Sequence, residues 1–327
     1  MLERRLTSET GSILKRYASI ARPDHWIKNI FMLPGTALAL ALYPELAAGR
    51  SFSRHVLSTL IALLSTCLIA SANYTINEWL DADFDKFHPV KSARPAARGE
   101  LDRRLVYLQY AVLAIAGLAL AATIGAVFVV FSVLLLVMGL VYNVEPVRSK
   151  DKAYIDVLSE SINNPLRLLL GWSAIIDSAL PPISVLVSYW MGGAYLMAIK
   201  RYAEFRMIDD HAQAARYRRS FANYDEKKLL ISAVFYAINS AFFLGIFLVK
   251  YRFEFLVSFP FFALLFSWYL GISMDARALA ISPERLHQER KFAAYVCILV
   301  GMLTALLFID IPFLKYFVDY NQIIRHR

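Results

Sequence analysis

The stretch HVLSTLIALLSTCLIASANYTINE (residues 55–78) contains no aspartate, lysine or arginine, and its one glutamate is at the last position. About 20 apolar residues in succession is the length that an α-helix needs to cross the hydrocarbon core of a bilayer. NEWLDADFDKFHPVKSARP (residues 77–95) overlaps the end of this run and contains three aspartates, two lysines and an arginine. Together the two stretches predict a membrane-spanning helix that ends in a charged loop.

The same alternation of apolar runs and charged loops continues along the chain. Of the 327 residues, 58% are hydrophobic and 19% are charged, and the mean hydropathy is +0.48. We therefore predict an all-α fold, a polytopic membrane bundle of about nine transmembrane helices. The expected spans are residues 27–47, 55–78, 104–122, 124–143, 154–174, 183–200, 229–249, 254–273 and 292–312.

This pattern divides the chain into three parts. Residues 1–26 are polar and charged and lack the apolar region of a signal peptide. Two interpretations of them stay open, a helix lying on the membrane surface or a solvated tail. Residues 27–312 are expected to form a single nine-helix transmembrane domain, and residues 313–327 a short tail on the non-cytoplasmic side.

The basic residues indicate how the chain is oriented. Of the 35 Lys and Arg residues, 27 lie in the N-terminal segment or in the loops after the second, fourth, sixth and eighth spans. Because basic loops stay cytoplasmic, we expect an inner (cytoplasmic) membrane protein whose N-terminus is cytoplasmic. The net charge of +9 follows mostly from this bias, so no nucleic-acid partner is expected. Cys67 and Cys297 each lie alone in a span, so neither a disulfide framework nor a zinc site is expected.

Acidic residues at the end of a span are not explained by orientation. Asn77, Asp81 and Asp85 follow one another at four-residue intervals, so a helix presents all three on one face. Two carboxylates and an amide oxygen suit Mg²⁺, which takes one or two carboxylates and completes its shell with water and substrate phosphates. We predict that these three residues bind Mg²⁺ and act in catalysis.

A basic turn follows the carboxylates directly. It contains Lys86, His88, Lys91 and Arg94, and two prolines end the helix and stiffen the turn. Cations beside a carboxylate–metal site suit a bound diphosphate, because the metal binds some oxygens while Lys and Arg neutralise the rest. The alternative is a solvated helix end whose charges pair with one another four residues apart. The asparagine one turn earlier and the basic turn afterwards favour the diphosphate site.

Two ionisable residues are expected inside the fifth span. Asp156 and Arg167 are eleven residues apart, three turns along one face of a continuous helix, and are expected to border one cavity. Two interpretations of Arg167 stay open, contact with a ligand phosphate or a structural pair with a buried acid. Tyr142, at the end of the fourth span, either orients a phosphate or belongs to the interfacial aromatic belt.

The residues around the carboxylates resemble a known motif. Asn77-Glu-Trp-Leu-Asp81-Ala-Asp-Phe-Asp85 resembles the N-D-x-x-D-x-x-x-D motif of the UbiA superfamily of intramembrane prenyltransferases. Glu78 stands where that family usually has aspartate. The continuation His88-Pro89-x-Lys91-x-x-Arg94-Pro95 is similar to the branch that uses phosphoribosyl diphosphate, the decaprenyl-phosphate phosphoribosyltransferases.

Three further stretches resemble this branch, in the same order along nearly the whole chain. They are Arg22-Pro23-x-x-Trp26-x-Lys28-Asn29, Lys200-Arg201-Tyr202-Ala203-Glu204 and Pro283-Glu284-x-Leu286-x-x-x-Arg290. The loop that begins at Tyr142 is a few residues longer than the Y-x-x-x-L-K pattern of the family, and Lys150 matches the family lysine better than Lys152 does. The resemblance implies that Lys28 and Lys150 supply positive charge to substrate phosphates.

The stretch at residues 200–206 bears on the choice of substrate. Aromatic prenyltransferases of the superfamily carry a second aspartate-rich motif here, whereas this chain has Lys200, Arg201 and Glu204. A sugar with both a diphosphate and a 5-phosphate has more anionic oxygens than an isoprenyl diphosphate, and extra cations would offset that charge. The plain alternative is that Lys200 and Arg201 only mark the cytoplasmic side.

The resemblance implies Mg²⁺-dependent transfer of 5-phosphoribosyl from phosphoribosyl diphosphate to a polyprenyl phosphate at the cytoplasmic face, for cell-envelope glycan synthesis. The lipid tail is expected in an apolar groove open to the bilayer. One alternative is a prenyltransferase that joins an isoprenyl diphosphate to an aromatic or other small acceptor. A second alternative is a lipid or metabolite transporter, for which broken, charged helices at mid-membrane depth would be typical. Lipid length and homo-oligomer formation stay open.

Overall fold

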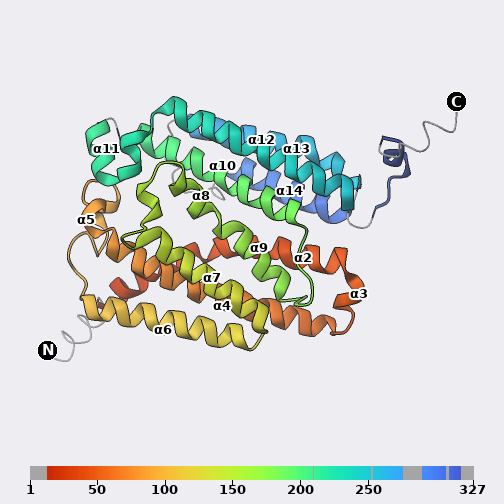
Figure 1. Ribbon diagram of the computed structural model, residues 1–327, viewed down its shortest axis with the longest axis horizontal. Coiled ribbons are helices and arrows are strands. Elements are labelled where there is room, and N and C mark those ends of the chain that lie inside the picture. The colour runs from red at the N-terminus through yellow and green to blue at the C-terminus, as the bar shows by residue number, and fades with distance from the viewer. Residues whose placement is uncertain (1–12, 209, 252, 275–288, 307–308, 318–327) are drawn as a thin grey trace. The chain divides into compact units, whose positions relative to one another are not determined.

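The computed structural model describes residues 13–208, 210–251, 253–274, 289–306 and 309–317, and these ranges contain helices and turns but no strand (Figure 1). The predicted all-α class is confirmed. The chain divides into two compact units, Met1–Pro181 with Ile208–Asp225 and Pro182–Met207 with Glu226–Arg327. The stretch Pro283–Arg290, which resembles a family loop, lies almost entirely outside the described residues.

The first unit is built around three long helices and several short ones. Its long helices are α4 (Phe52–Leu80), α6 (Arg103–Ala122) and α7 (Ala126–Asn143). Its short α-helices are α2 (Leu33–Leu42), α3 (Pro44–Ala47), α5 (Ala82–Asp85), α8 (Ile155–Ser161), α9 (Asn163–Ser173) and α11 (His211–Tyr217). Its 3₁₀ helices are η1 (Pro23–Met32), η2 (Lys91–Ala93), η3 (Ser149–Asp151) and η4 (Arg219–Asn223).

Six helices in the described residues are long and apolar enough to cross a membrane. They are Phe52–Leu80, Arg103–Ala122, Ala126–Asn143, Ile183–Met207, Glu226–Tyr251 and Phe253–Met274, and they coincide with the second, third, fourth, sixth, seventh and eighth predicted spans. Exposed aliphatic side chains cover their outer surfaces, as Leu108, Val112 and Ile115 do on α6. This distribution is typical of a protein that lipid surrounds, because the polar residues that need partners are turned inward.

Two of the other three predicted spans are divided into shorter helices, and the count of nine stays a prediction. The first is divided among η1, α2 and α3, with Pro44 beginning the third piece. The fifth is divided into α8 and α9, because Pro165 has no amide hydrogen to donate to the carbonyl of Ser161. Asp156 and Arg167 therefore lie on different helices, and the expectation of one continuous helix carrying both is wrong. The ninth is represented by α14 (Arg290–Leu306).

Residues 13–21 are helical and are held against the start of α6. The amide of Asp102 donates to the Tyr17 hydroxyl (2.9 Å), and the Gln109 side chain donates to the Tyr17 carbonyl (3.0 Å). Ile20 is fully buried. This part of the N-terminal segment is therefore packed structure, which excludes the solvated-tail interpretation for it.

The helices of the first unit pack through small residues. A side chain at Gly35 on α2 would lie 2.0 Å from the carbonyl oxygen of Leu168, and one at Gly171 on α9 would lie 1.8 Å from that of Met32. The two backbones approach so closely that only glycine fits at either position. The adjoining core brings Ile69 of α4 together with apolar residues of α6, α7 and α9. This packing fixes α4 and α7 beside each other, and the candidate site lies where both end.

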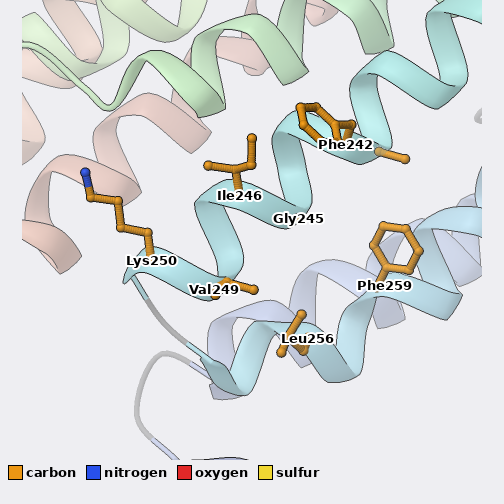
Figure 2. A pocket seen from close by; sticks show the side chains of 8 residues that line it. Phe242, Gly245, Ile246, Val249, Lys250, Leu256 and Phe259 are labelled. Atoms are coloured by element: carbon orange, nitrogen blue, oxygen red, sulfur yellow. The ribbon is translucent and has the colours of Figure 1, made fainter. Parts of the chain in front are cut away.

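The second unit contains α10 (Ile183–Met207), α12 (Glu226–Tyr251), η5 (Phe253–Ser258), α13 (Phe259–Met274), α14 and η7 (Pro312–Phe317). Helices α10 and α12 pack together, and Ser188 and Ser240 each donate to the other's carbonyl oxygen at 3.0 Å. Figure 2 shows an apolar groove of about 670 Å³ between α12 and the segment η5–α13. Side chains such as Phe242, Val249 and Phe259 line it, so it suits a hydrocarbon chain of a surrounding lipid.

Candidate active site

Asn77, Asp81 and Asp85 lie where α4 gives way to α5. The backbone keeps the helical hydrogen bonds here, since the amide of Asp81 donates to the carbonyl of Asn77 (3.0 Å) and that of Asp85 to the carbonyl of Asp81 (2.8 Å). Nδ2 of Asn77 donates to Oδ2 of Asp81 at 3.2 Å. The four-residue spacing therefore does bring the amide and the first carboxylate together.

Asp81 is bound by cations from the loop after α7. Arg148 Nη2 donates to Asp81 Oδ1 at 2.9 Å, and Lys150 Nζ donates to the same oxygen. Asn143 connects this group, because its Oδ1 accepts from Lys150 (2.7 Å) and from Asn77 Nδ2 (2.5 Å). The arrangement joins the ends of α4 and α7 through charged hydrogen bonds.

Burial and charge act in opposite directions on this cluster. Burial raises the pKa of Asp81, but the nearby cations, Lys150 foremost, outweigh it and the pKa lies below its ordinary value. Burial, assisted by the charge of Arg148, lowers the pKa of Lys150 to about 8 although Asp81 raises it. Asp81 is therefore ionised at neutral pH. Because the pKa of Lys150 is about 8, this lysine is mostly protonated at neutral pH and loses its proton slightly above it.

Asp85 has its own cation, from the basic turn. Arg94 Nη1 donates to Asp85 Oδ2 at 2.6 Å, and its Nε lies 4.0 Å from Glu78 Oε2. Burial lowers the pKa of Arg94, but Asp85 and Glu78 outweigh it and the pKa is raised. Arg94 is thus a fixed positive charge between two buried carboxylates.

Glu78 is part of this group although it lies off the face of the three predicted ligands. Arg22 Nη2 donates to Glu78 Oε2 at 2.9 Å. Helix η1 makes this contact possible because it runs along α4, with Trp26 donating to Ser71 (2.8 Å) and Asn29 to the sulfur of Cys67 (3.2 Å). Within the described residues, no hydrogen-bond donor reaches the buried Oε1 of Glu78.

The basic turn is folded against α11. Nδ1 of His88 accepts the amides of Val90 (3.0 Å) and Lys91 (3.1 Å), so this histidine shapes the turn. Its ring lies 4.6 Å from that of Tyr217, whose hydroxyl accepts from Lys91 Nζ. Figure 1 shows α11 beside α5 in this region, and the side chain of Gln213 donates to the carbonyl of Phe87 (2.9 Å). Lys86 instead lies in an exposed pair with Asp83 (2.7 Å).

The remaining predicted residues of the first unit fall into two separate groups. Asp156 is fully buried and accepts from Tyr224 (2.7 Å) and Ser220 (3.2 Å), and Arg218 lies 3.9 Å away. Tyr142 donates to Glu160 (2.7 Å) and accepts from Arg218 (3.3 Å). Asp156 and Tyr142 therefore anchor the segment Arg218–Tyr224 beside the loop after α7.

Arg167 lies in the other group. It donates to Asn29 Oδ1 at 2.9 Å and to the carbonyl of Asn163 at 3.3 Å, so its partners in these contacts are an amide and a carbonyl. Lys28 directly precedes Asn29 in the chain, and its Nζ lies 3.4 Å from His25 Nδ1. The predicted cavity bordered jointly by Asp156 and Arg167 has no counterpart in these contacts.

Lys200, Arg201 and Glu204 belong to the second unit. Arg201 Nη1 donates to Glu204 Oε2 at 3.2 Å, and both side chains are buried, while Lys200 is half-buried. The four-residue spacing predicts Lys200 and Glu204 on one face of a helix, and in the structure the neighbouring Arg201 forms an ion pair with Glu204. The role of this group in substrate binding stays a prediction.

Sequence reasoning gave no individual role to several residues that the structure brings into the site. These residues are Arg22, Glu78, Asn143, Arg148, Tyr217 and Arg218. Arg22 was quoted only as part of a motif, and Arg148 only as a member of a loop whose best match was Lys150. A signal was present in both cases, because each is an arginine close to a predicted membrane boundary and next to residues already chosen.

Comparisons with known proteins identify the family of the chain. Residues 30–291 match the UbiA prenyltransferase family. The decaprenyl-phosphate phosphoribosyltransferase of Mycolicibacterium smegmatis is 28% identical over 213 residues, 64% of this chain and 62% of that protein, so the match spans less than two thirds of the relative. The protein of the same name from Mycobacterium tuberculosis is 28% identical over 225 residues, 68% of this chain and 70% of that protein.

The solved structures show the same fold. A UbiA homolog from Archaeoglobus fulgidus bound to DMAPP and Mg²⁺ superposes with a TM-score of 0.66 at 20% identity, covering 90% of this chain and all of that one. The family match extends over most of the chain and includes the carboxylates, the basic turn and the loop after α7. The protein is therefore a membrane-embedded enzyme that belongs to the UbiA prenyltransferase family.

Proposed function

We propose that the protein transfers 5-phosphoribosyl from phosphoribosyl diphosphate to a polyprenyl phosphate in a Mg²⁺-dependent reaction. The observation that supports this most is the pairing of two carboxylates with basic side chains at one end of the first unit. Asp81 contacts Arg148 and Lys150, and Asp85 contacts Arg94. A metal–diphosphate complex needs both kinds of group, and the relatives named above carry the name of this activity.

The donor types at this position suit a hard divalent cation, although the described residues contain no group of three or more His, Cys, Asp or Glu side chains placed to hold a metal ion. Asn77, Asp81 and Asp85 supply an amide and two carboxylates, and a buried oxygen of Glu78 has no hydrogen-bond donor among the described residues. We assign Asn77, Asp81 and Asp85 as the ligands, in line with the preference of Mg²⁺ for oxygen and for few carboxylates. When bound, the ion would stabilise the negative charge that develops on the departing diphosphate.

The basic residues of the chain would bind and orient the donor. Lys91, Arg94 and Lys150 lie beside the carboxylates and would neutralise phosphate oxygens, while Tyr217 holds Lys91 in place. The polyprenyl phosphate is already an anion at neutral pH and needs little help from a base. Its oxygen would attack C1 from the face opposite the leaving diphosphate, so the α-linked donor would give a β-linked product.

Orientation in the membrane belongs to the same proposal. The excess of basic residues in the loops that carry the site favours a cytoplasmic location for it, and an inner-membrane protein. The apolar outer surface leaves the lipid acceptor able to approach from the bilayer. The product would serve as a pentose donor for cell-envelope glycans.

The test uses the purified protein in lipid nanodiscs with labelled phosphoribosyl diphosphate, polyprenyl phosphate and Mg²⁺. We expect a labelled lipid, and its loss when EDTA removes the metal. The matched reaction contains an isoprenyl diphosphate and 4-hydroxybenzoate instead. Turnover only in the second reaction would replace this proposal by the aromatic prenyltransferase alternative. Label in the lipid with EDTA present would contradict the metal requirement.

A further inference from the structure

The carboxylate of Asp81 is already occupied by the protein's own donors. Oδ1 accepts from Arg148 (2.9 Å) and from Lys150, and Oδ2 accepts from Asn77 (3.2 Å). The proposed function assigns the same carboxylate to Mg²⁺. Oδ1 already accepts from two donors, so a metal ion that binds this oxygen must replace one of them, while in the contacts of the described residues Oδ2 keeps one lone pair open.

The two cations differ in how firmly they are held. Arg148 also donates to the carbonyl of Asn143 (2.9 Å), lies 3.2 Å from Asp151 and stacks on Phe84 at 4.7 Å. These contacts hold it at the junction of α4 and α7 whether or not Asp81 is available. Arg148 is therefore the fixed cation of the pair.

Lys150 has fewer contacts and a more adaptable side chain. Besides Asp81 it donates to Oδ1 of Asn143 (2.7 Å) and lies 5.7 Å from the centre of the Tyr142 ring. Lysine carries a compact ammonium on a flexible stem, whereas the arginine fork is rigid. Although Lys150 is buried, its departure from Asp81 would break fewer contacts than that of Arg148 and would leave in place the junction that Arg148 maintains.

Electrostatics decides when this happens. A divalent cation placed on Asp81 while Lys150 remains there is repelled at short range in a buried site, where screening is weak. A diphosphate removes this obstacle because its oxygens accept the ammonium. The metal then gains the carboxylate at the same time as the lysine gains the phosphate.

We propose that Lys150 and the metal ion exchange on Asp81, so that the metal binds tightly only together with a diphosphate. The inference rests on the proposed function and deepens it, since it states how the donor and the metal enter the site. Because coupling between two ligands is reciprocal, the metal must increase the affinity for diphosphate by the same factor.

The test measures Mn²⁺ binding to the metal-free, full-length protein by electron paramagnetic resonance, with and without inorganic pyrophosphate at matched free Mn²⁺ concentration. We expect pyrophosphate to tighten Mn²⁺ binding about tenfold or more, within the usual range of coupling between sites. The K150Q variant should bind Mn²⁺ alone about tenfold more tightly than the wild type, because the competitor is gone. It should also lose most of the pyrophosphate effect.

Matched variants separate this from a general loss of charge or structure. K152Q removes the same charge from an exposed lysine two residues further on and should behave like the wild type. K150M supplies a second neutral variant if K150Q does not fold. Structural damage would weaken metal binding, so tighter binding in a variant that lacks the Lys150 ammonium would point to the loss of a competing cation.

Two results would overturn the exchange: wild-type Mn²⁺ affinity that is indifferent to pyrophosphate, or neutral Lys150 variants that bind Mn²⁺ no more tightly than the wild type. D81N shows whether the proposed function fails as well. If D81N binds Mn²⁺ as the wild type does, the metal is not on Asp81 and both ideas fall. If binding depends on Asp81 but not on Lys150, only the exchange is wrong.

Discussion

Asp81 and Asp85 are four residues apart, yet their cations come from different distances along the chain. Arg94, the partner of Asp85, is nine residues away, whereas Arg148 and Lys150, the partners of Asp81, are 67 and 69 residues away. The first pair is contained in one short stretch of sequence. The second exists only because α4 and α7 pack together and end at the same level.

The two pairs also differ in how permanent they are. Arg94 lies between Asp85 and the buried Glu78, and Glu78 is bound in turn by Arg22. Lys150 shares Asp81 with an arginine that has other partners. The cation of the local pair is therefore held by two carboxylates at once, while the proposed exchange would transfer the lysine of the distant pair to a substrate phosphate.

Removing the carboxylate of the distant pair should have the largest effect. We expect D81N to reduce phosphoribosyl transfer by at least about a hundredfold, because the residue is assigned both to the metal and to the placement of Lys150. Initial rates with labelled donor measure this loss. D83N, an exposed aspartate two residues away, is the control and should retain activity. Full activity in D81N would remove Asp81 from the metal site.

Removing the cation of the local pair should lower stability in addition to weakening donor binding. R94Q leaves Asp85 and Glu78 buried with less compensating charge, so we expect the free energy of unfolding to fall by about 3 kcal/mol. Denaturant unfolding in mild detergent, followed by tryptophan fluorescence, measures the change. R94K should recover only part of it, because an ammonium lacks the fork that reaches two carboxylates. An unchanged unfolding curve for R94Q would show that this pair is not structural.

The basic turn contains two lysines, five residues apart, whose surroundings differ. Lys91 contacts the buried Tyr217, whereas Lys86 lies in an exposed pair with Asp83. We expect K91Q to raise the KM for phosphoribosyl diphosphate about tenfold, the size of one charged hydrogen bond. K86Q should change it less than about twofold, since surface pairs contribute little. Equal effects of the two changes would contradict the assignment of Lys91 to the donor.

Tyr217 should give the smallest effect. Y217F keeps the ring that packs on His88 and removes only the hydroxyl that accepts from Lys91. We expect the KM for the donor to rise about threefold with kcat unchanged, because the hydroxyl acts on the donor only by holding Lys91 in place and Lys91 keeps its charge. A loss of kcat without a change in KM would instead place the hydroxyl near the reacting atoms.

The long helices and the shared position of the three proposed metal ligands could be predicted from the sequence because both depend on short-range patterns. Six apolar runs became long helices, and the four-residue spacing of Asn77, Asp81 and Asp85 survived the change from α4 to α5. The broken segments were harder to predict, because apolar content does not show where a backbone hydrogen bond is missing. Pro165 carried that signal for the break between α8 and α9.

The partners of the site residues could not be predicted in the same way. Glu78 was set aside because it lies off the face of the three ligands, yet η1 approaches α4 from that side and places Arg22 on it. Arg148 and Lys150 were both in view, but only the packed ends of α4 and α7 show that they share one oxygen of Asp81. The contact of Arg167 with Asn29 also joins residues far apart in the sequence, and its role toward a phosphate stays a prediction.

The sequence by itself determined the all-α membrane architecture and the stretch that supplies the carboxylates, because hydrophobic length and helical periodicity are properties of neighbouring residues. It also indicated the family, through motifs that are each contained in a few residues. Only the tertiary structure decided which cation binds which carboxylate. That choice depends on burial and on how closely the helix backbones approach one another. The packing places Arg148 in contact with Asp81 although the two residues are 67 positions apart in the sequence.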